Sequence, residues 1–213
     1  MAGLYLGVDV GTSSVRAGLV DGSGRLVAAP AVREISRHSP APGQYEQSST
    51  EIWVAVCGAV RGALAGLPDT AKPTIVLGLG FTGTCSLVLV GPGDSVLQVG
   101  DSPDRDVIMW MDHRAGREAE LITATRHPVL DSVGGAVSLE MQLPKLLWLK
   151  THRPEVWAAA ERCYDLPDWL VHRATNTEVR SLCSAVCKAG TQTLSGFFKT
   201  QFDRLVIIQF ECT

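Results

Sequence analysis

Small and polar residues follow the first apolar segment of the chain, in the order Asp9-Val10-Gly11-Thr12-Ser13-Ser14. A glycine in such a turn lets the backbone approach a phosphate group closely, hydroxyl groups can donate hydrogen bonds to it, and a carboxylate can hold Mg²⁺ through water. Arg16 stands close enough in sequence to add positive charge. The segment predicts a phosphate-binding turn, and an ordinary hairpin turn is the alternative that these residues leave open.

Two later segments have the residue types of a sugar site. Phe81-Thr82-Gly83-Thr84-Cys85-Ser86 places small residues after an apolar run, which leaves room for a ligand at the end of a strand. Trp110-Met111-Asp112-His113-Arg114 offers an aromatic face for a carbon skeleton, a carboxylate for hydroxyl hydrogens and an arginine that can hold the carboxylate. The alternatives are a strand-to-hairpin turn for the first segment, and a core tryptophan, a helix-capping aspartate and a surface histidine for the second.

Lys188 is a further candidate, since its amine can donate to a sugar hydroxyl or carbonyl. A solvated lysine at a helix end is the alternative. Cys183 and Cys187 stand one helical turn apart nearby, but no histidine pair accompanies them. We therefore expect the cysteines of this chain to be reduced thiols, most of them buried, and we expect no cysteine metal site.

Composition restricts the class of protein. The chain has 213 residues, of which 46% are hydrophobic and 19% charged, and its net charge is −3. This length suffices for one domain with a core but is short for two domains that close on each other. The positive charges are scattered, so we expect no nucleic-acid partner. Asp9 interrupts an amino-terminal apolar run that lacks a positive leader, so we expect neither a signal peptide nor a membrane span, and a cytoplasmic protein is the simplest interpretation.

The elements that must position these residues begin with a meander and a helix. Three antiparallel strands are expected at residues 4–9, 15–20 and 25–35. Ser48 followed by Glu51 predicts a capping box that starts a helix. The apolar run at 74–79 then predicts a strand buried on both faces, and a strand after a helix implies a crossover and a mixed sheet.

The remaining elements are shorter. We expect a hairpin of residues 86–90 and 95–99, and a strand at 107–111. Helices are expected at 114–125, 141–151 and 154–160. The predicted fold is α/β, with one main mixed sheet flanked by helices.

Taken together, these segments resemble the FGGY family of carbohydrate kinases, with ribulokinase-like members nearest. The resemblance covers about residues 4–188 and rests on the order and spacing of six segments: Gly7–Thr12, Glu46-Gln47, Gly80–Thr82, Trp110–Arg114, Pro144–Lys150 and Asp165–Leu170. It implies an actin-like (ribonuclease H-like) fold with two domains, in which the sugar and ATP meet in the cleft between them. It also implies ATP and Mg²⁺ as cofactors and a small-molecule sugar as the partner.

The resemblance assigns the nucleotide side of this site to the amino-terminal turn. Asp9 would help to place Mg²⁺. The phosphates of ATP would face Gly11, Thr12, Ser13 and Arg16.

It assigns the sugar side to the later segments. Gly83 and Lys188 fall where ribulokinases contact their sugar, and Trp110 falls where glycerol kinases pack theirs. Asp112 would bind the sugar or support the same wall. Thr82 lies at the pocket edge, where ribulokinase-like members commonly carry an aspartate, so the pocket loses a negative charge there.

The implied reaction transfers the γ-phosphoryl group of ATP to a primary hydroxyl of a ketose. A pentulose such as D-ribulose is favoured over glycerol, because Cys85-Ser86 stand where glycerol kinases carry Arg-Glu. Residues 1–188 would form an incomplete first kinase domain and 189–213 a tail that does not match the family. The catalytic aspartate is expected in the missing part.

Such a chain would have little activity alone, would be marginally stable and would expose apolar surface. Two alternatives remain: a non-enzymatic actin-like nucleotide-binding module, and an inactive isoform that pairs with the full-length kinase. A homo-oligomer is a further expectation about partners.

Overall fold

A computed structural model describes residues 3–68 and 76–184 and has the predicted α/β class. The strands are β1 (Leu4–Val10), β2 (Ser14–Val20), β3 (Ala31–Glu34), β4 (Glu46–Gln47), β5 (Val76–Gly83), β6 (Leu87–Val90), β7 (Val107–Ile108) and β8 (Arg162–Asp165). The helices are α1 (Ser49–Ala65), α2 (Gly116–Ala124), α3 (Gln142–His152), α4 (Pro154–Ala159) and α5 (Leu166–Thr175). Two 3-10 turns lie at Pro92–Asp94 and Pro128–Val133.

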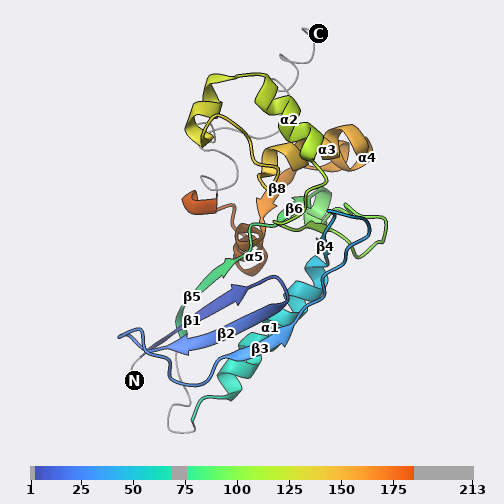
Figure 1. Ribbon diagram of the computed structural model, residues 1–213. Coiled ribbons are helices and arrows are strands. Elements are labelled where there is room, and N and C mark those ends of the chain that lie inside the picture. Colours follow the sequence, from blue (N-terminus) through green and yellow to red (C-terminus); the bar gives the residue numbers. More distant parts are fainter. Residues whose placement is uncertain (1–2, 69–75, 185–213) are drawn as a thin grey trace.

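The first sheet has the strand order β3-β2-β1-β5. β1 is antiparallel to β2 and parallel to β5, so the predicted meander, helix and crossover are confirmed. Period-two alternation forms β1, whose buried side chains are Leu4, Leu6, Val8 and Val10. These side chains lie on the face of the sheet along which α1 runs (Figure 1). β3 is shorter than predicted, because the chain before it makes only an isolated bridge.

Helix α1 begins where its capping residue predicts. The Ser48 hydroxyl accepts a hydrogen bond from the Glu51 amide at 3.2 Å. The reciprocal bond expected of a capping box is replaced, since the Glu51 carboxylate accepts from the amide and hydroxyl of Ser36 at 3.0 and 2.8 Å. A Cβ at Gly62 would lie 2.9 Å from the Ala31 side chain, so this glycine lets α1 approach β3 closely.

The prediction of one main sheet is wrong. A second, antiparallel sheet has the order β4-β7-β6-β8 and lies between the first sheet and helices α2–α4 (Figure 1). β4 and β8 were not predicted, and the strand expected at 107–111 is only β7. In the hairpin expected of residues 86–90 and 95–99, the second strand is reduced to a single bridge between Val96 and Val90, because a 3-10 turn follows β6.

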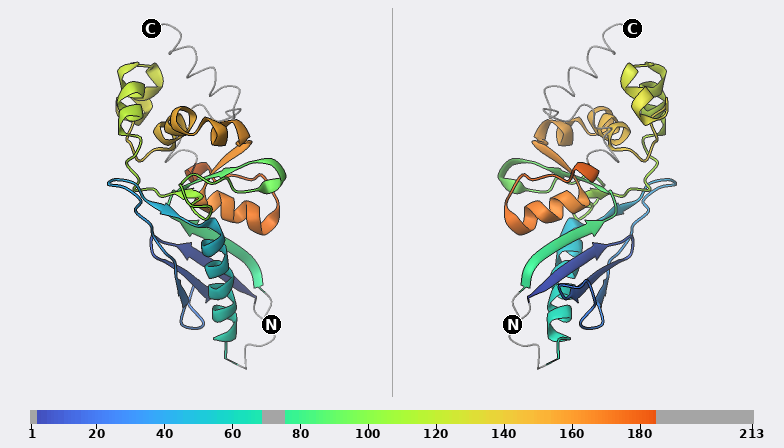
Figure 2. Two further views of the ribbon diagram at one scale, coloured as in Figure 1. Left: turned by 90° about the vertical axis from the view of Figure 1, so that its right-hand side faces the viewer. Right: turned by 90° about the vertical axis from the view of Figure 1, so that its left-hand side faces the viewer.

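The central strand β6 is buried on both faces. Val88 and Val90 belong to the core that α1, α5 and the first sheet share. Leu87 and Leu89 belong to a second core with side chains of α3 and α4. The second sheet therefore joins two cores, and Figure 2 shows it between the first sheet and the helices beyond.

The strand predicted to be buried on both faces is instead an edge strand. Within the described residues, β5 pairs only with β1. The side chains of Val76, Leu77 and Leu79 are 37%, 60% and 47% exposed, because α1 covers the other strands of the sheet and α5 reaches β5 nearer its end. The apolar run was recognised as a strand, but its apolar character did not reveal which neighbours it has.

The predicted helices at 114–125, 141–151 and 154–160 are confirmed as α2, α3 and α4, within two residues at each end. None of the helices in the described ranges is long and apolar enough to cross a membrane.

The exposed leucines of β5 lead to a testable prediction. Replacing Leu77 and Leu79 by lysine should reduce the binding of a hydrophobic dye and should change the free energy of unfolding by no more than about 0.5 kcal/mol, because both side chains face solvent. Leu6→Lys is the matched control: this side chain is 6% exposed, and a buried unpaired charge should abolish folding. A large loss of stability in the double variant, measured by urea unfolding, would show that the edge is covered in solution.

Candidate functional site

Two of the predicted segments meet in the structure. The indole Nε1 of Trp110 donates a hydrogen bond to Thr12 Oγ1 at 3.3 Å, although the residues are 98 positions apart. Thr12 lies in the turn between β1 and β2, whereas Trp110 follows β7 in the second sheet. The phosphate-binding turn and the aromatic wall predicted from the sequence are thus neighbours.

Hydrogen bonds to its backbone hold the turn between β1 and β2 in place. Gly11 N donates to Ser14 O at 2.9 Å, which closes the turn, and Ile35 N donates to Ser13 O at 3.1 Å. The fully buried Gln47 donates from Nε2 to Thr12 O at 3.0 Å. Because its backbone carbonyls are held in this way, the turn keeps its shape while Ser13 remains exposed.

Asp9, Arg16 and Thr82 lie side by side at one end of the first sheet. Asp9 is opposite Arg16 in β2 and opposite Thr82 in β5, so the three side chains share one face. Arg16 Nη1 lies 3.4 Å from Asp9 Oδ2, with side chains 55% and 48% exposed. A pair this exposed adds little to stability, and both charged groups remain accessible to a ligand.

The donor set near Asp9 fits a magnesium ion that is held mainly by other ligands. Mg²⁺ in nucleotide sites commonly uses one or two carboxylates, several waters and phosphate oxygens. Asp9 supplies one carboxylate, and within the described ranges no group of three His, Cys, Asp or Glu side chains could hold a metal ion by itself. The chemistry therefore suits an ion that arrives with a nucleotide.

Gly83 is the last residue of β5 and lies opposite Val10 of β1. A Cβ at this position would meet Val10 O at 2.9 Å, which real side chains do not tolerate. The amide of Thr84 also donates to Val10 O, at 3.0 Å. The predicted sugar contact Gly83 is thus also a packing requirement at the end of the first sheet.

The buried hydroxyl group of Ser86 ties the Trp110 backbone to the segment after β5. The fully buried Ser86 accepts a hydrogen bond at Oγ from Trp110 N at 3.2 Å. Thr84 Oγ1 lies 3.1 Å from the same Ser86 oxygen. The two segments predicted to form the sugar side are therefore directly connected.

The carboxylate of Asp112 is enclosed by hydrogen-bond donors of the protein. It is fully buried, and its two oxygens accept from Tyr45 N at 2.6 Å, from Arg114 N at 3.0 Å, and from Arg114 Nε and Nη2 at 2.9 and 2.8 Å. Of the two roles expected for it, this geometry favours support of the wall over contact with a sugar, because its acceptor positions are occupied.

Arg114 holds this support together. Its Nη2 also donates to Glu46 Oε1 at 2.8 Å, and the guanidinium lies 5.0 Å from the centre of the Trp148 ring. The side chains of all three charged residues are at most 3% exposed. Burial disfavours the guanidinium charge, yet the hydrogen bonds that Arg114 donates to Asp112 and Glu46 raise its pKa above the ordinary value.

The other predicted residues are placed as follows. His113 is a surface residue whose Nε2 lies 3.3 Å from Glu140 Oε1, as the alternative interpretation expected. Lys188 lies outside the described residues. Sequence reasoning gave no role to Glu46, Gln47 or Ser86, although the first two were part of the family resemblance.

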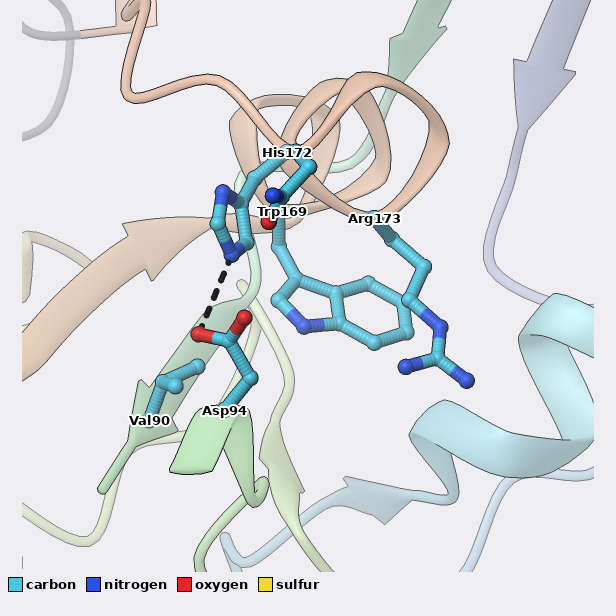
Figure 3. A pocket seen from close by; sticks show the side chains of 6 residues that line it. Val90, Asp94, Trp169, His172 and Arg173 are labelled. Carbon is cyan, nitrogen blue, oxygen red and sulfur yellow. Dashed lines mark hydrogen bonds and ion pairs between the residues drawn. The ribbon is translucent and has the colours of Figure 1, made fainter. Parts of the chain in front are cut away.

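A small cavity lies elsewhere, beside α5. It has a volume of about 100 Å³ and is lined by Val90, Asp94, Trp169, His172, Arg173 and Asn176. His172 Nε2 lies 3.3 Å from Asp94 Oδ1 (Figure 3). Bonds from Arg162 and His172 hold the pKa of Asp94 below its ordinary value. Among the described residues, none of the predicted site residues lines this cavity. The contact between His172 and Asp94 links α5 to the turn after β6.

Comparison with known proteins decides the family. The model of the FGGY family of carbohydrate kinases, N-terminal domain, matches residues 4–211. The chain belongs to the FGGY family. An FGGY carbohydrate kinase domain-containing protein of Danio rerio is 49% identical over 187 residues, which are 86% of this chain and 33% of the relative. A D-ribulokinase of Saccharomyces cerevisiae is 42% identical over 193 residues, which are 89% of this chain and 27% of the relative.

Solved structures confirm the actin-like fold of the sugar kinases. A xylulose kinase from Rhodospirillum rubrum matches with a TM-score of 0.81 at 24% identity, over 96% of this chain and 40% of that chain. A gluconate kinase from Lactobacillus acidophilus matches with a TM-score of 0.80 at 19% identity, over 97% and 40%. The chain spans about a third of the length of the curated relatives named above.

The buried network predicts a large effect for Arg114→Met. Removal of the guanidinium leaves two buried carboxylates without their partner, so the free energy of unfolding should fall by about 3–5 kcal/mol in urea titrations at neutral pH. Arg25→Met is the matched control, because the Arg25 side chain is 82% exposed in its pair with Asp21 and its loss should cost less than about 1 kcal/mol. Equal effects of the two substitutions would contradict the assignment of Arg114 as the centre of the site.

Proposed function

We propose that this chain supplies the sugar-binding wall and the phosphate-binding turn of an ATP-dependent sugar kinase, which transfers the γ-phosphoryl group of ATP to a primary hydroxyl of a ketose. The observation that carries the proposal is the hydrogen bond between Trp110 and Thr12, because it puts the wall next to the turn. Phosphoryl transfer depends chiefly on positioning two reactants and on relieving negative charge.

On the nucleotide side, Gly11, Thr12 and Ser13 would receive the phosphates of ATP, and Arg16 would add positive charge. Asp9 would hold Mg²⁺ through water, and the ion, when bound, would neutralise charge on the transferred group. The exposed, weakly held pair of Asp9 and Arg16 supports this assignment, because neither group must leave a buried partner to reach the nucleotide.

On the sugar side, Trp110 would pack against the carbon skeleton, and Thr82, Gly83 and Lys188 would line the pocket edge. Asp112 would support the wall through its buried hydrogen bonds. We assign the base that accepts the proton of the attacking hydroxyl to the part of the longer relatives that this chain does not cover.

A pentulose is the substrate that we propose. Support comes from the relative named D-ribulokinase at 42% identity, and from Cys85 and Ser86, which stand where glycerol kinases carry Arg-Glu. Ser86 is fully buried and bonded to Trp110, so it supports the pocket and is not a substitute for those charged groups. We propose that the enzyme is cytoplasmic. The free thiols of Cys57 and Cys163 agree with a reducing compartment.

A second candidate is an inactive form that pairs with a full-length kinase or with another copy of itself. The exposed apolar edge of β5 favours it, since such an edge can pair with another chain. Co-purification of tagged chain with the full-length kinase would support pairing with the kinase, whereas sedimentation as a lone monomer in its presence would exclude it.

Turnover distinguishes the proposal from an independent enzyme. The purified chain with ATP, Mg²⁺ and D-ribulose should give no sugar phosphate signal in ³¹P NMR, because the proposed base is absent. Turnover in the range of ordinary kinases, about 1–100 per second, would contradict the proposal.

A chimera tests the wall itself. Residues 4–188 of this chain should support D-ribulose phosphorylation when they replace the matching segment of the Danio rerio relative. Trp110→Ala in the chimera should raise the KM for D-ribulose about 10-fold, because loss of a packed ring removes more than 1 kcal/mol of sugar binding. An active chimera whose KM for D-ribulose is unchanged by Trp110→Ala would show that the ring does not contact the sugar.

A further inference from the structure

We infer that Lys145 is a positioning residue for Trp110, and that one face of α3 sets the geometry of the whole sugar wall. Lys145 is fully buried, a rare state for a lysine. Its Nζ donates to Met109 O at 2.8 Å and to Trp110 O at 3.0 Å. The buried ammonium therefore binds the backbone of the residue that carries the ring.

Gln142, one turn earlier on α3, holds the other segment of the wall. Its Nε2 donates to Cys85 O at 3.1 Å and also to the Asp165 carboxylate. Cys85 immediately precedes Ser86, whose hydroxyl accepts from Trp110 N. The two hydrogen bonds of the Gln142 amide thus fix the segment after β5 relative to the start of α5.

Trp148, one turn after Lys145, is the third residue on this face of α3. Its ring lies 5.0 Å from the Arg114 guanidinium, which binds Asp112 and Glu46. Gln142, Lys145 and Trp148 stand three positions apart, so their side chains project from one side of the helix. Leu146 and Leu149 pack α3 into the second core, which makes the helix a rigid platform.

A purely structural lysine is a poor explanation for this arrangement. Burial of an ammonium group costs several kcal/mol, and an apolar side chain of similar length would fill the same space. Lys145 nevertheless places its ammonium group here, where it donates to two successive backbone carbonyls next to the Trp110 ring. The inference rests on the proposed function for its meaning, since Trp110 is the proposed sugar contact, but the geometry can be tested without sugar.

The test uses the 213-residue chain labelled with 5-fluorotryptophan, in which Trp110→Phe identifies the Trp110 resonance. Lys145→Met should shift or broaden the ¹⁹F resonance of Trp110 and leave those of Trp53 and Trp169 unchanged. Lys150→Met is the matched control on the same helix. The amine of Lys150 lies 5.8 Å from the Trp157 ring centre, so this variant should move the Trp157 resonance and not that of Trp110.

An unmoved Trp110 resonance in Lys145→Met would overturn the inference, and so would equal shifts of all five tryptophans, which would indicate a general structural role. If Lys145→Met does not fold, the hydrogen bonds of Lys145 are measured in the wild-type chain instead. The Lys145 ¹⁵Nζ should exchange its protons slowly and show couplings through hydrogen bonds to the carbonyls of Met109 and Trp110. Fast exchange without such couplings would contradict the placement of the amine.

Sugar is added only afterwards. A Trp110 shift on titration with D-ribulose tests the proposed function. A Trp110 resonance that responds to Lys145→Met but not to sugar would leave the positioning role intact and would reject the sugar site.

Discussion

The candidate site depends on the buried ion pairs that the Arg114 guanidinium makes with the carboxylates of Asp112 and Glu46. All three side chains are removed from water, so each needs the others to offset the cost of burying its charge. Glu46 lies in β4, Asp112 in the segment that follows Trp110, and the ring of Trp148 in α3 covers the guanidinium. One charged cluster therefore fixes a strand, a loop and a helix relative to each other.

The site is built where two sheets meet. The first sheet supplies a turn whose carbonyls are bonded and whose outer side chains remain accessible. The second sheet and α3 supply a wall whose backbone is held by buried hydroxyl, amide and ammonium groups. Rigid elements that hold a few exposed groups are what a reaction governed by positioning requires. The fold thus brings Thr12 and Trp110, which the resemblance assigned to one site, into contact.

Much of the fold was predictable, because long periodic segments report their own structure. Alternation gave β1 and β2, and helical spacing gave α1, α3 and α4. The second sheet was missed because β4 has two residues and β8 four, which are too short for periodicity to show. The exposure of β5 could not be predicted either, since an apolar run reports a strand but not the elements that cover it.

The site was predicted in its residue types more than in its roles. Thr12 and Trp110 were identified separately, and only the fold shows that they touch. Asp112 has the carboxylate that a sugar site needs, but the proximity of Arg114 and Tyr45 turns it inward. Lys145 belonged to a recognised motif, yet no local pattern reveals that a lysine is buried.

Contact between Thr12 and Trp110 is the most direct test of this account. In NOE spectra of the isotope-labelled chain, the indole Nε1 proton of Trp110 should show cross-peaks to the β and methyl protons of Thr12, and these should weaken in Arg114→Met. An indole proton that exchanges freely with water and shows no cross-peak to Thr12 would mean that the turn and the wall are separate, and that they do not form one site.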